Sequence, residues 1–203
     1  MINFKGHKKE ESKELQIIDL TEVLLKRYND NPKINVVGRY SVSKLWSMMN
    51  GYLKVENYTK PEPVNFEGAM NMWQGTHKHV QVQELLDEYD KEIKIVKKIE
   101  YIGGDFEIVG MCDAINPEHG LELKTSQKLH SSAKRWHVYQ AKIYCTMFER
   151  EIFKVVQPVR TKERIYLNVL EEVKRNDSWF NKEMQKLGAY HEQLKLYEKS
   201  KNN

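Results

Sequence analysis

The hydrophobic pattern of the chain changes at about Asp90. Up to that point, apolar residues recur every three or four positions, which predicts amphipathic helices. Beyond it, short segments rich in Ile, Val, Phe and Tyr follow one another, a composition that is typical of strands. We expect strands at residues 93–102, 105–115, 120–125, 151–160 and 163–169.

Helices are expected before these strands, once between them and once after them. They run over residues 14–28, from Ser41 or Ser43 through Met49, and over 66–89, 131–148 and 177–199. This order predicts an α/β (α+β) fold in which a central mixed β-sheet is flanked by helices.

The length of 203 residues suits a single domain with a buried core. We expect one domain over residues 1–203, without internal repeats. Its parts are a disordered polar start at 1–12, a helical part at 13–90, a sheet core at 91–170 and the final helix at 177–199.

Composition excludes several classes of protein. Two cysteines, Cys112 and Cys145, cannot form a disulfide framework or a four-cysteine zinc or iron–sulfur site. A net charge of +4 does not by itself indicate a nucleic-acid partner. No apolar run has the length of a membrane span, and the N-terminus lacks a signal-peptide core. We therefore expect a cytoplasmic protein, or a viral protein in the host cytoplasm, with no membrane partner.

Two carboxylates and a lysine lie on consecutive expected strands. Asp113 ends one apolar run, and Glu122 and Lys124 follow on the next. Because side chains alternate along a strand, Glu122 and Lys124 share one face. The link at residues 116–120 (Asn-Pro-Glu-His-Gly) predicts a tight turn, so the strands are expected to pair as a hairpin that brings Asp113 close to Glu122.

Such a carboxylate pair predicts a divalent cation. Two neighbouring carboxylates repel each other unless a cation lies between them, and Mg²⁺ and Mn²⁺ prefer oxygen ligands. Lys124 would then orient or deprotonate an attacking water, or stabilise charge on a phosphate, as in phosphodiester hydrolysis. The alternative is a solvated surface hairpin, because Glu-x-Lys arises often by chance in a chain with 31% charged residues.

A histidine on the expected helix at 66–89 is a second candidate. His79 lies on the same helix face as Val82 and Leu86, whereas His77 points about 200° away and is expected to face solvent. Gly75, one turn earlier, would allow another backbone to approach. A neutral His79 imidazole would ligate the same metal, and the alternative is a core histidine bonded to a carbonyl.

The helix at 131–148 supplies the remaining candidates. Gln140 and Tyr144 are one turn apart and would hold a phosphate or position Lys124, unless they form only a polar helix edge. Basic residues with interleaved Trp136 and Tyr139 suggest phosphate contacts and base stacking, and the alternative is a solvated charged face. These basic residues are Lys128, Lys134, Arg135 and Lys142.

In this order, the elements resemble the PD-(D/E)xK nuclease superfamily, and within it the RecB-type exonuclease branch, which includes CRISPR-associated and viral exonucleases. The resemblance covers roughly residues 40–144. Its motifs are Tyr40-Ser-Val-Ser-Lys-Leu45, Gly75-x-x-x-His79, Gly110-x-x-Asp113, Glu122-x-Lys124 and Gln140-x-x-x-Tyr144.

The resemblance implies a restriction-endonuclease-like fold and a metal-dependent DNA nuclease. It implies an exonuclease in recombination, repair or replication-end processing, acting on single- or double-stranded DNA. The enzyme would act alone, as a homo-oligomer or with a separate helicase or recombination partner. Asp113, Glu122 and Lys124 would be catalytic, and Gln140 and Tyr144 would place substrate or the lysine. The implied Mg²⁺ or Mn²⁺ ligands are His79, Asp113, Glu122 and the Leu123 carbonyl.

The chain departs from the family pattern in two places. It lacks the four cysteines that hold an iron–sulfur cluster in many members, so no such cluster is expected. Many members also carry an acid four residues after the motif histidine, where this chain has Gln83.

Two other functions remain open from the sequence. One is a structure-specific or restriction-type endonuclease of the same fold. The other is a catalytically inactive nucleic-acid-binding or assembly protein that retains the scaffold.

Overall fold

The computed structural model describes residues 19–30, 34–61, 63–126 and 128–201. The helices are α1 (Thr21–Asn29), α2 (Val42–Met49), a short 3₁₀ turn (Val55–Asn57), α3 (Phe66–Gln83), α4 (Arg135–Met147) and α5 (Asp177–Lys201). The strands are β1 (Arg39–Ser41), β2 (Asp90–Ile99), β3 (Phe106–Ile115), β4 (His119–Leu123), β5 (Ile152–Arg160) and β6 (Ile165–Lys174). The expected disordered start at 1–12 and residues 14–18 of the first expected helix lie outside the described residues.

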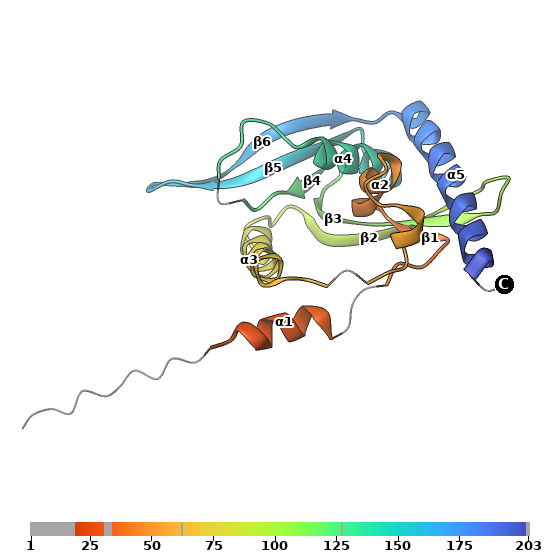
Figure 1. The fold of residues 1–203 in the computed structure, drawn as a ribbon. Helices are drawn as coiled ribbons and strands as arrows, with labels where there is room; N and C mark the ends of the chain where they lie inside the picture. Colours follow the sequence, from red (N-terminus) through yellow and green to blue (C-terminus); the bar gives the residue numbers. More distant parts are fainter. Residues whose placement is uncertain (1–18, 31–33, 62, 127, 202–203) are drawn as a thin grey trace, which may run out of the picture.

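Within the described part of the chain, six strands form one mixed sheet (Figure 1). β3 pairs antiparallel with β2 along its whole length. β4 pairs antiparallel with β3 and parallel with β5, and β6 pairs antiparallel with β5. The predicted hairpin of β3 and β4 and the predicted mixed sheet are therefore confirmed.

The second edge of β3 is shared by two strands. β1 pairs with residues 107–109, and β4 pairs only with Ala114 and Ile115. Among the described residues, no strand pairs with residues 110–113 on this edge. β3 and β4 therefore diverge next to Asp113, and side chains rather than a strand occupy the opening.

The sheet is covered on both faces (Figure 1). The main core cluster joins one face of the sheet to α2, α4 and α5, with residues such as Leu45, Ile143 and Leu187 fully buried. On the other face, Leu121 and Leu123 of β4 lie in a second cluster against which α3 packs. Because side chains alternate along β4, Glu122 is directed away from α3, toward the face that carries α4.

The structure corrects the expected end of one helix. α3 ends at Gln83, not at residue 89, and β2 begins at Asp90, not at 93. After Gln83 the chain continues through tight turns, with hydrogen bonds from Leu85 N to Val82 O (3.0 Å) and from Leu86 N to Gln83 O (3.1 Å). The sequence keeps a helix-like spacing of apolar residues beyond Gln83, because Leu86 and Tyr89 pack against the second core cluster.

Other boundaries also differ. α4 begins at Arg135 rather than 131, and β6 extends to Lys174 rather than 169. β1 was not expected, because three residues are too short to show an alternating pattern. Ser41 does occupy the N-cap position of α2, but its hydroxyl contacts Ser43 Oγ (2.8 Å) rather than a helix backbone amide. None of the described helices has both the length and the apolarity needed to cross a bilayer. The single domain over residues 1–203 stays a prediction.

Candidate active site

Asp113 lies where β3 and β4 diverge. Its Oδ2 accepts a hydrogen bond of 2.6 Å from the backbone N–H of Leu123. A side chain thus replaces the strand-to-strand bond that the ladder would otherwise form at this point. Since the N–H and C=O of a strand residue leave by the same edge, the Leu123 carbonyl is also on the edge that faces β3.

Glu122 and Lys124 share a face of β4, as predicted, and contact each other. Lys124 Nζ is 2.5 Å from Glu122 Oε1, while Glu122 as a whole is only 3% exposed. Burial, together with the negative charge of Asp113, raises the pKa of Glu122 to about 7 despite the opposing charge of Lys124. The solvated-hairpin alternative is wrong, because a solvated surface would leave this carboxylate exposed.

His79 reaches the site from α3. Its Nε2 lies 3.4 Å from Asp113 Oδ2. Burial alone would lower the pKa of His79, but contact with Asp113 and the charge of Glu122 outweigh it, so the pKa is raised. His77 is exposed, as expected, and contacts the Trp73 carbonyl of its own helix. Gly75 is not required for a close approach, since an added Cβ would lie 3.7 Å from Thr125 Oγ1.

These donors suit a hard divalent cation. His79 Nε2 and Glu122 Oε2 are buried without a hydrogen-bond partner in the described structure. Carboxylate and carbonyl oxygens around them are the ligands that Mg²⁺ and Mn²⁺ prefer. In the described residues, however, no three His, Cys, Asp or Glu side chains are grouped closely enough to hold an ion as they stand, and Glu122 contacts Lys124 instead. The ligand set His79, Asp113, Glu122 and Leu123 stays a prediction.

Tyr144 of α4 occupies the opening on the edge of β3. Its hydroxyl donates to the Met111 carbonyl (2.9 Å) and accepts from the Met111 N–H (3.3 Å) and from Gln140 Nε2 (3.1 Å). Gly110 makes room for the ring, because a Cβ there would lie 2.5 Å from Tyr144 Cε1. Gln140 and Tyr144 therefore meet at β3, next to the carboxylates, rather than forming a solvated helix edge.

Gln83 completes the same edge of β3. Its side chain is buried, with 6% exposure, and Nε2 donates a 2.8 Å hydrogen bond to the Asp113 carbonyl. An unprotonated Asp or Glu has no proton to donate to this carbonyl. Gln83, at the position where many family members carry an acid, therefore donates the hydrogen bond that the backbone carbonyl of Asp113 needs.

A cavity of about 340 Å³ opens beside Lys124 and His79. Only one of the three basic residues predicted to bind substrate lines it. Lys134 lines this cavity, whereas Arg135 lines a different one between α2, α4 and α5. Lys128 is exposed and lines neither. The three side chains do not line one common cavity, and their roles stay predictions.

Among the residues of this cavity that were not predicted is a histidine of α4. His137 lines it together with Lys124 and Lys134. Burial, and then the charges of Lys124 and Lys134, lower the pKa of His137 to about 3, so its imidazole is neutral at neutral pH. Its position three residues before Gln140 places it on the same helix face, a spacing that the sequence shows.

No protein-family model matches the chain, and no curated protein matches it. Solved structures do. A structure of LHK-Exo in complex with dAMP has a TM-score of 0.58 and 13% identity, over 82% of this chain and 94% of that one. An alkaline exonuclease, LHK-Exo from Laribacter hongkongensis, has a TM-score of 0.54 and 12% identity, over 90% and 98%. A phage-related exonuclease from Haemophilus somnus 129PT has a TM-score of 0.51 and 12% identity, over 82% and 96%.

The resemblance read from the motifs is therefore confirmed at the level of the fold, which these solved exonucleases share. The chain has their fold, a mixed sheet flanked by helices. At 12–13% identity the likeness carries the fold alone, and the chemistry must be argued from the residues of the site.

Proposed function

We propose that the protein is a metal-dependent deoxyribonuclease that hydrolyses phosphodiester bonds, acting as an exonuclease. One observation carries the proposal: the buried Glu122 and the partly buried Lys124 lie beside Asp113 and His79 where β3 and β4 diverge. Such a cluster is costly to bury, and Glu122 Oε2 and His79 Nε2 have no hydrogen-bond partner in the described structure. The fold of solved exonucleases around it supports the proposal.

His79, Asp113, Glu122 and the Leu123 carbonyl would hold Mg²⁺ or Mn²⁺. A bound divalent cation would stabilise charge on the phosphate and lower the pKa of a water molecule. The chain itself fixes the geometry. The Leu123 N–H holds Asp113, and Gln83 holds the backbone of the same residue.

Lys124 would act on the reacting groups once Glu122 turns to the cation. Its ammonium is partly buried, and a charge acts more strongly there than in bulk water. It would stabilise negative charge on the phosphate, or orient or deprotonate the attacking water. Gln140 and Tyr144 keep β3 and α4 together beside it.

DNA is the proposed substrate. A solved exonuclease of this fold is in complex with dAMP, a deoxynucleotide monophosphate. Recombination, repair and replication-end processing are the proposed roles, with a homo-oligomer or a separate helicase or recombination protein as partner. An endonuclease of the same fold is the second candidate, because the buried cluster contains the same hydrolytic groups whether or not a DNA end is needed.

Digestion of end-labelled DNA tests the proposal. Linear single- and double-stranded DNA and a covalently closed circle are each incubated with Mg²⁺, Mn²⁺ or a chelator. We expect metal-dependent shortening of linear DNA and an intact circle. Rapid cutting of the circle would favour the endonuclease, and DNA binding without any cleavage would favour the catalytically inactive binding protein.

A further inference from the structure

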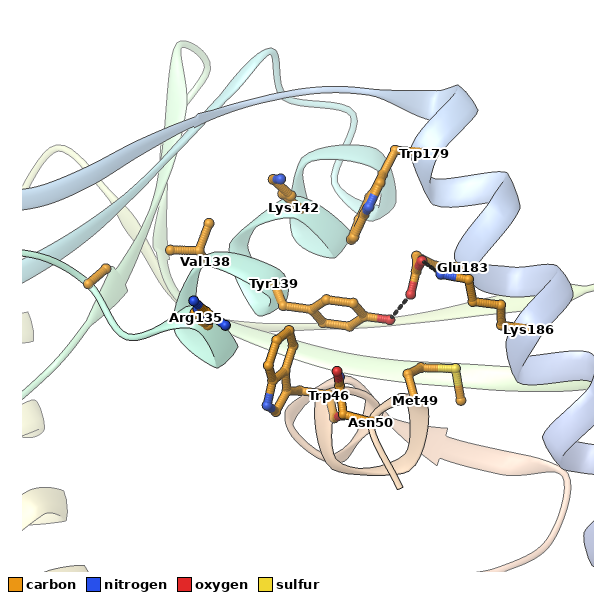
Figure 2. A pocket seen from close by; sticks show the side chains of 11 residues that line it. Trp46, Met49, Asn50, Arg135, Val138, Tyr139, Lys142, Trp179, Glu183 and Lys186 are labelled. Atoms are coloured by element: carbon orange, nitrogen blue, oxygen red, sulfur yellow. Dashed lines mark hydrogen bonds and ion pairs between the residues drawn. The ribbon is translucent and has the colours of Figure 1, made fainter. Parts of the chain in front are cut away.

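A second cavity, of about 400 Å³, lies between α2, α4 and α5 (Figure 2). We call it the aromatic pocket. Its volume is within the range of about 300–1,000 Å³ that small-molecule sites occupy. α4 contributes residues at the spacing of one helix face, and the pocket is separate from the cavity beside Lys124. The lining side chains that matter here are Trp46, Arg135, Tyr139, Lys142, Trp179 and Lys186.

Three aromatic rings from three helices form the walls of the aromatic pocket (Figure 2). The ring centroids of Trp46 and Tyr139 are 5.5 Å apart, and those of Tyr139 and Trp179 are 5.2 Å apart. Trp46 and Trp179 are only partly buried, so part of each indole is open to a ligand. The planes of the two ring pairs are inclined by 70° and 77°, so Tyr139 packs edge-to-face against both indoles, and the aromatic surface left for a ligand is that of the partly exposed Trp46 and Trp179. Aromatic side chains stack on nucleobases without regard to sequence.

The charge of the aromatic pocket is positive on its α4 side. Lys142 Nζ lies 5.3 Å from the Trp179 ring centroid. Neither Lys142 nor Arg135 has an acidic partner among the described residues. The acid of the pocket, Glu183, is buried and is already held by Lys186 (2.5 Å) and the Tyr139 hydroxyl (2.8 Å). Two unpaired cations beside open aromatic rings suit a ligand that is both aromatic and anionic.

The aromatic pocket adjoins the candidate active site through one short segment. Ser132 and Lys134 line the cavity beside Lys124, while Ala133 and Arg135 line the aromatic pocket. Alternate residues before and at the start of α4 thus face two cavities. A strand held by the first cavity would pass over this segment and reach the second.

We propose that the aromatic pocket binds one nucleotide of a single strand that extends from the candidate active site. The base stacks against the exposed parts of Trp46 and Trp179, and the two phosphates that flank it lie one on Arg135 and one on Lys142. This inference rests on the proposed nuclease function, and it adds a single-stranded segment to the substrate.

Binding of a fluorescent oligothymidylate in a chelator, measured by anisotropy over a series of salt concentrations, tests the inference without cleavage. The variants are Arg135→Ala and Lys142→Ala, with Lys199→Ala as the control on the far end of α5. Each phosphate contact contributes about 0.7 to the slope of log K against log salt for a single strand. The slope is negative, and we expect each pocket variant to reduce its magnitude by about 0.7. Lys199→Ala should leave the slope unchanged.

The aromatic walls are tested in the same assay. Trp179→Ala is expected to weaken binding about 5- to 150-fold, as the loss of one aromatic side chain that stacks on a base does, and Trp179→Phe is expected to recover most of it. Thermal melting checks that both variants are folded. If Trp179→Phe folds like the wild type but binds no better than Trp179→Ala, the result would count against stacking.

The outcomes separate this inference from the proposed function. Unchanged affinity and slope in the Arg135→Ala, Lys142→Ala double variant would overturn the inference, and so would a wild-type protein that binds no oligothymidylate. Metal-dependent cleavage of DNA by the wild type is measured separately. Its absence would refute the nuclease, even where the pocket variants behave as expected.

Discussion

Replacement of Glu122 by glutamine should change how the stability of the metal-free protein depends on pH. Glu122 is 3% exposed, and burial with the charge of Asp113 raises its pKa from 4.5 to about 7. A carboxyl group whose pKa is raised on folding stabilises the folded protein fully below its unfolded pKa. That contribution is lost as the pH rises through the folded pKa. The wild type should therefore lose stability between about pH 4.5 and pH 7, and Glu122→Gln should not lose this part.

The size of the effect follows from the shift. A change in pKa from 4.5 to about 7 corresponds to about 3 kcal/mol at about 1.36 kcal/mol per unit. Lys124 contacts the same side chain, so this value is an upper limit for the variant. Relative to the wild type, Glu122→Gln should gain up to about 3 kcal/mol between pH 4.5 and pH 8.

Urea denaturation in a chelator at pH 5, 6, 7 and 8 measures this difference. Glu171→Gln, at an exposed carboxylate on β6, controls for the loss of one negative charge. A difference in unfolding free energy that stays constant across this range would refute a raised Glu122 pKa. Added Mg²⁺ or Mn²⁺ should stabilise the wild type more than Glu122→Gln, because a ligand that binds only the folded state stabilises it by mass action.

Three further substitutions test how the opening on β3 is held. Gln83→Glu should destabilise the protein by about 1–3 kcal/mol at neutral pH in urea denaturation, because the Asp113 carbonyl loses its donor; an unchanged midpoint would contradict this. Tyr144→Phe should lower stability by about 1–3 kcal/mol, since both backbone groups of Met111 lose their partner, and a smaller loss would show that water replaces the hydroxyl. Gly110→Ala should destabilise by about 1–3 kcal/mol through the Cβ contact with the Tyr144 ring, and a crystal structure with an unmoved ring would contradict that reason.

Much of the fold follows from local sequence patterns. The change of pattern at Asp90 and the turn at residues 116–120 were sufficient to predict the sheet and the hairpin of β3 and β4. The end of α3 was not predictable, since Leu86 and Tyr89 keep helical spacing only because they pack on the second core cluster. Tertiary packing therefore set that boundary, not local preference.

The site was partly predictable for the same reason. Alternation on β4 placed Glu122 and Lys124 on one face, and the structure shows their contact. The role of Gln83 was hidden, because its partner is a backbone carbonyl 30 residues away and no side-chain pattern marks it. The separation of Lys134 from Arg135 was hidden too, since neighbours before and at the start of a helix point to different cavities.

Cleavage of end-labelled linear DNA in Mg²⁺ by the wild type and by Lys124→Ala tests the central claim most directly. Lys199→Ala, prepared in parallel, controls for the removal of a lysine and for a contaminating nuclease. We predict that Lys124→Ala reduces the rate by about 10²–10⁴-fold, the usual contribution of a group that assists proton transfer, while Lys199→Ala cleaves like the wild type. Equal cleavage by all three proteins would contradict a catalytic site at the divergence of β3 and β4.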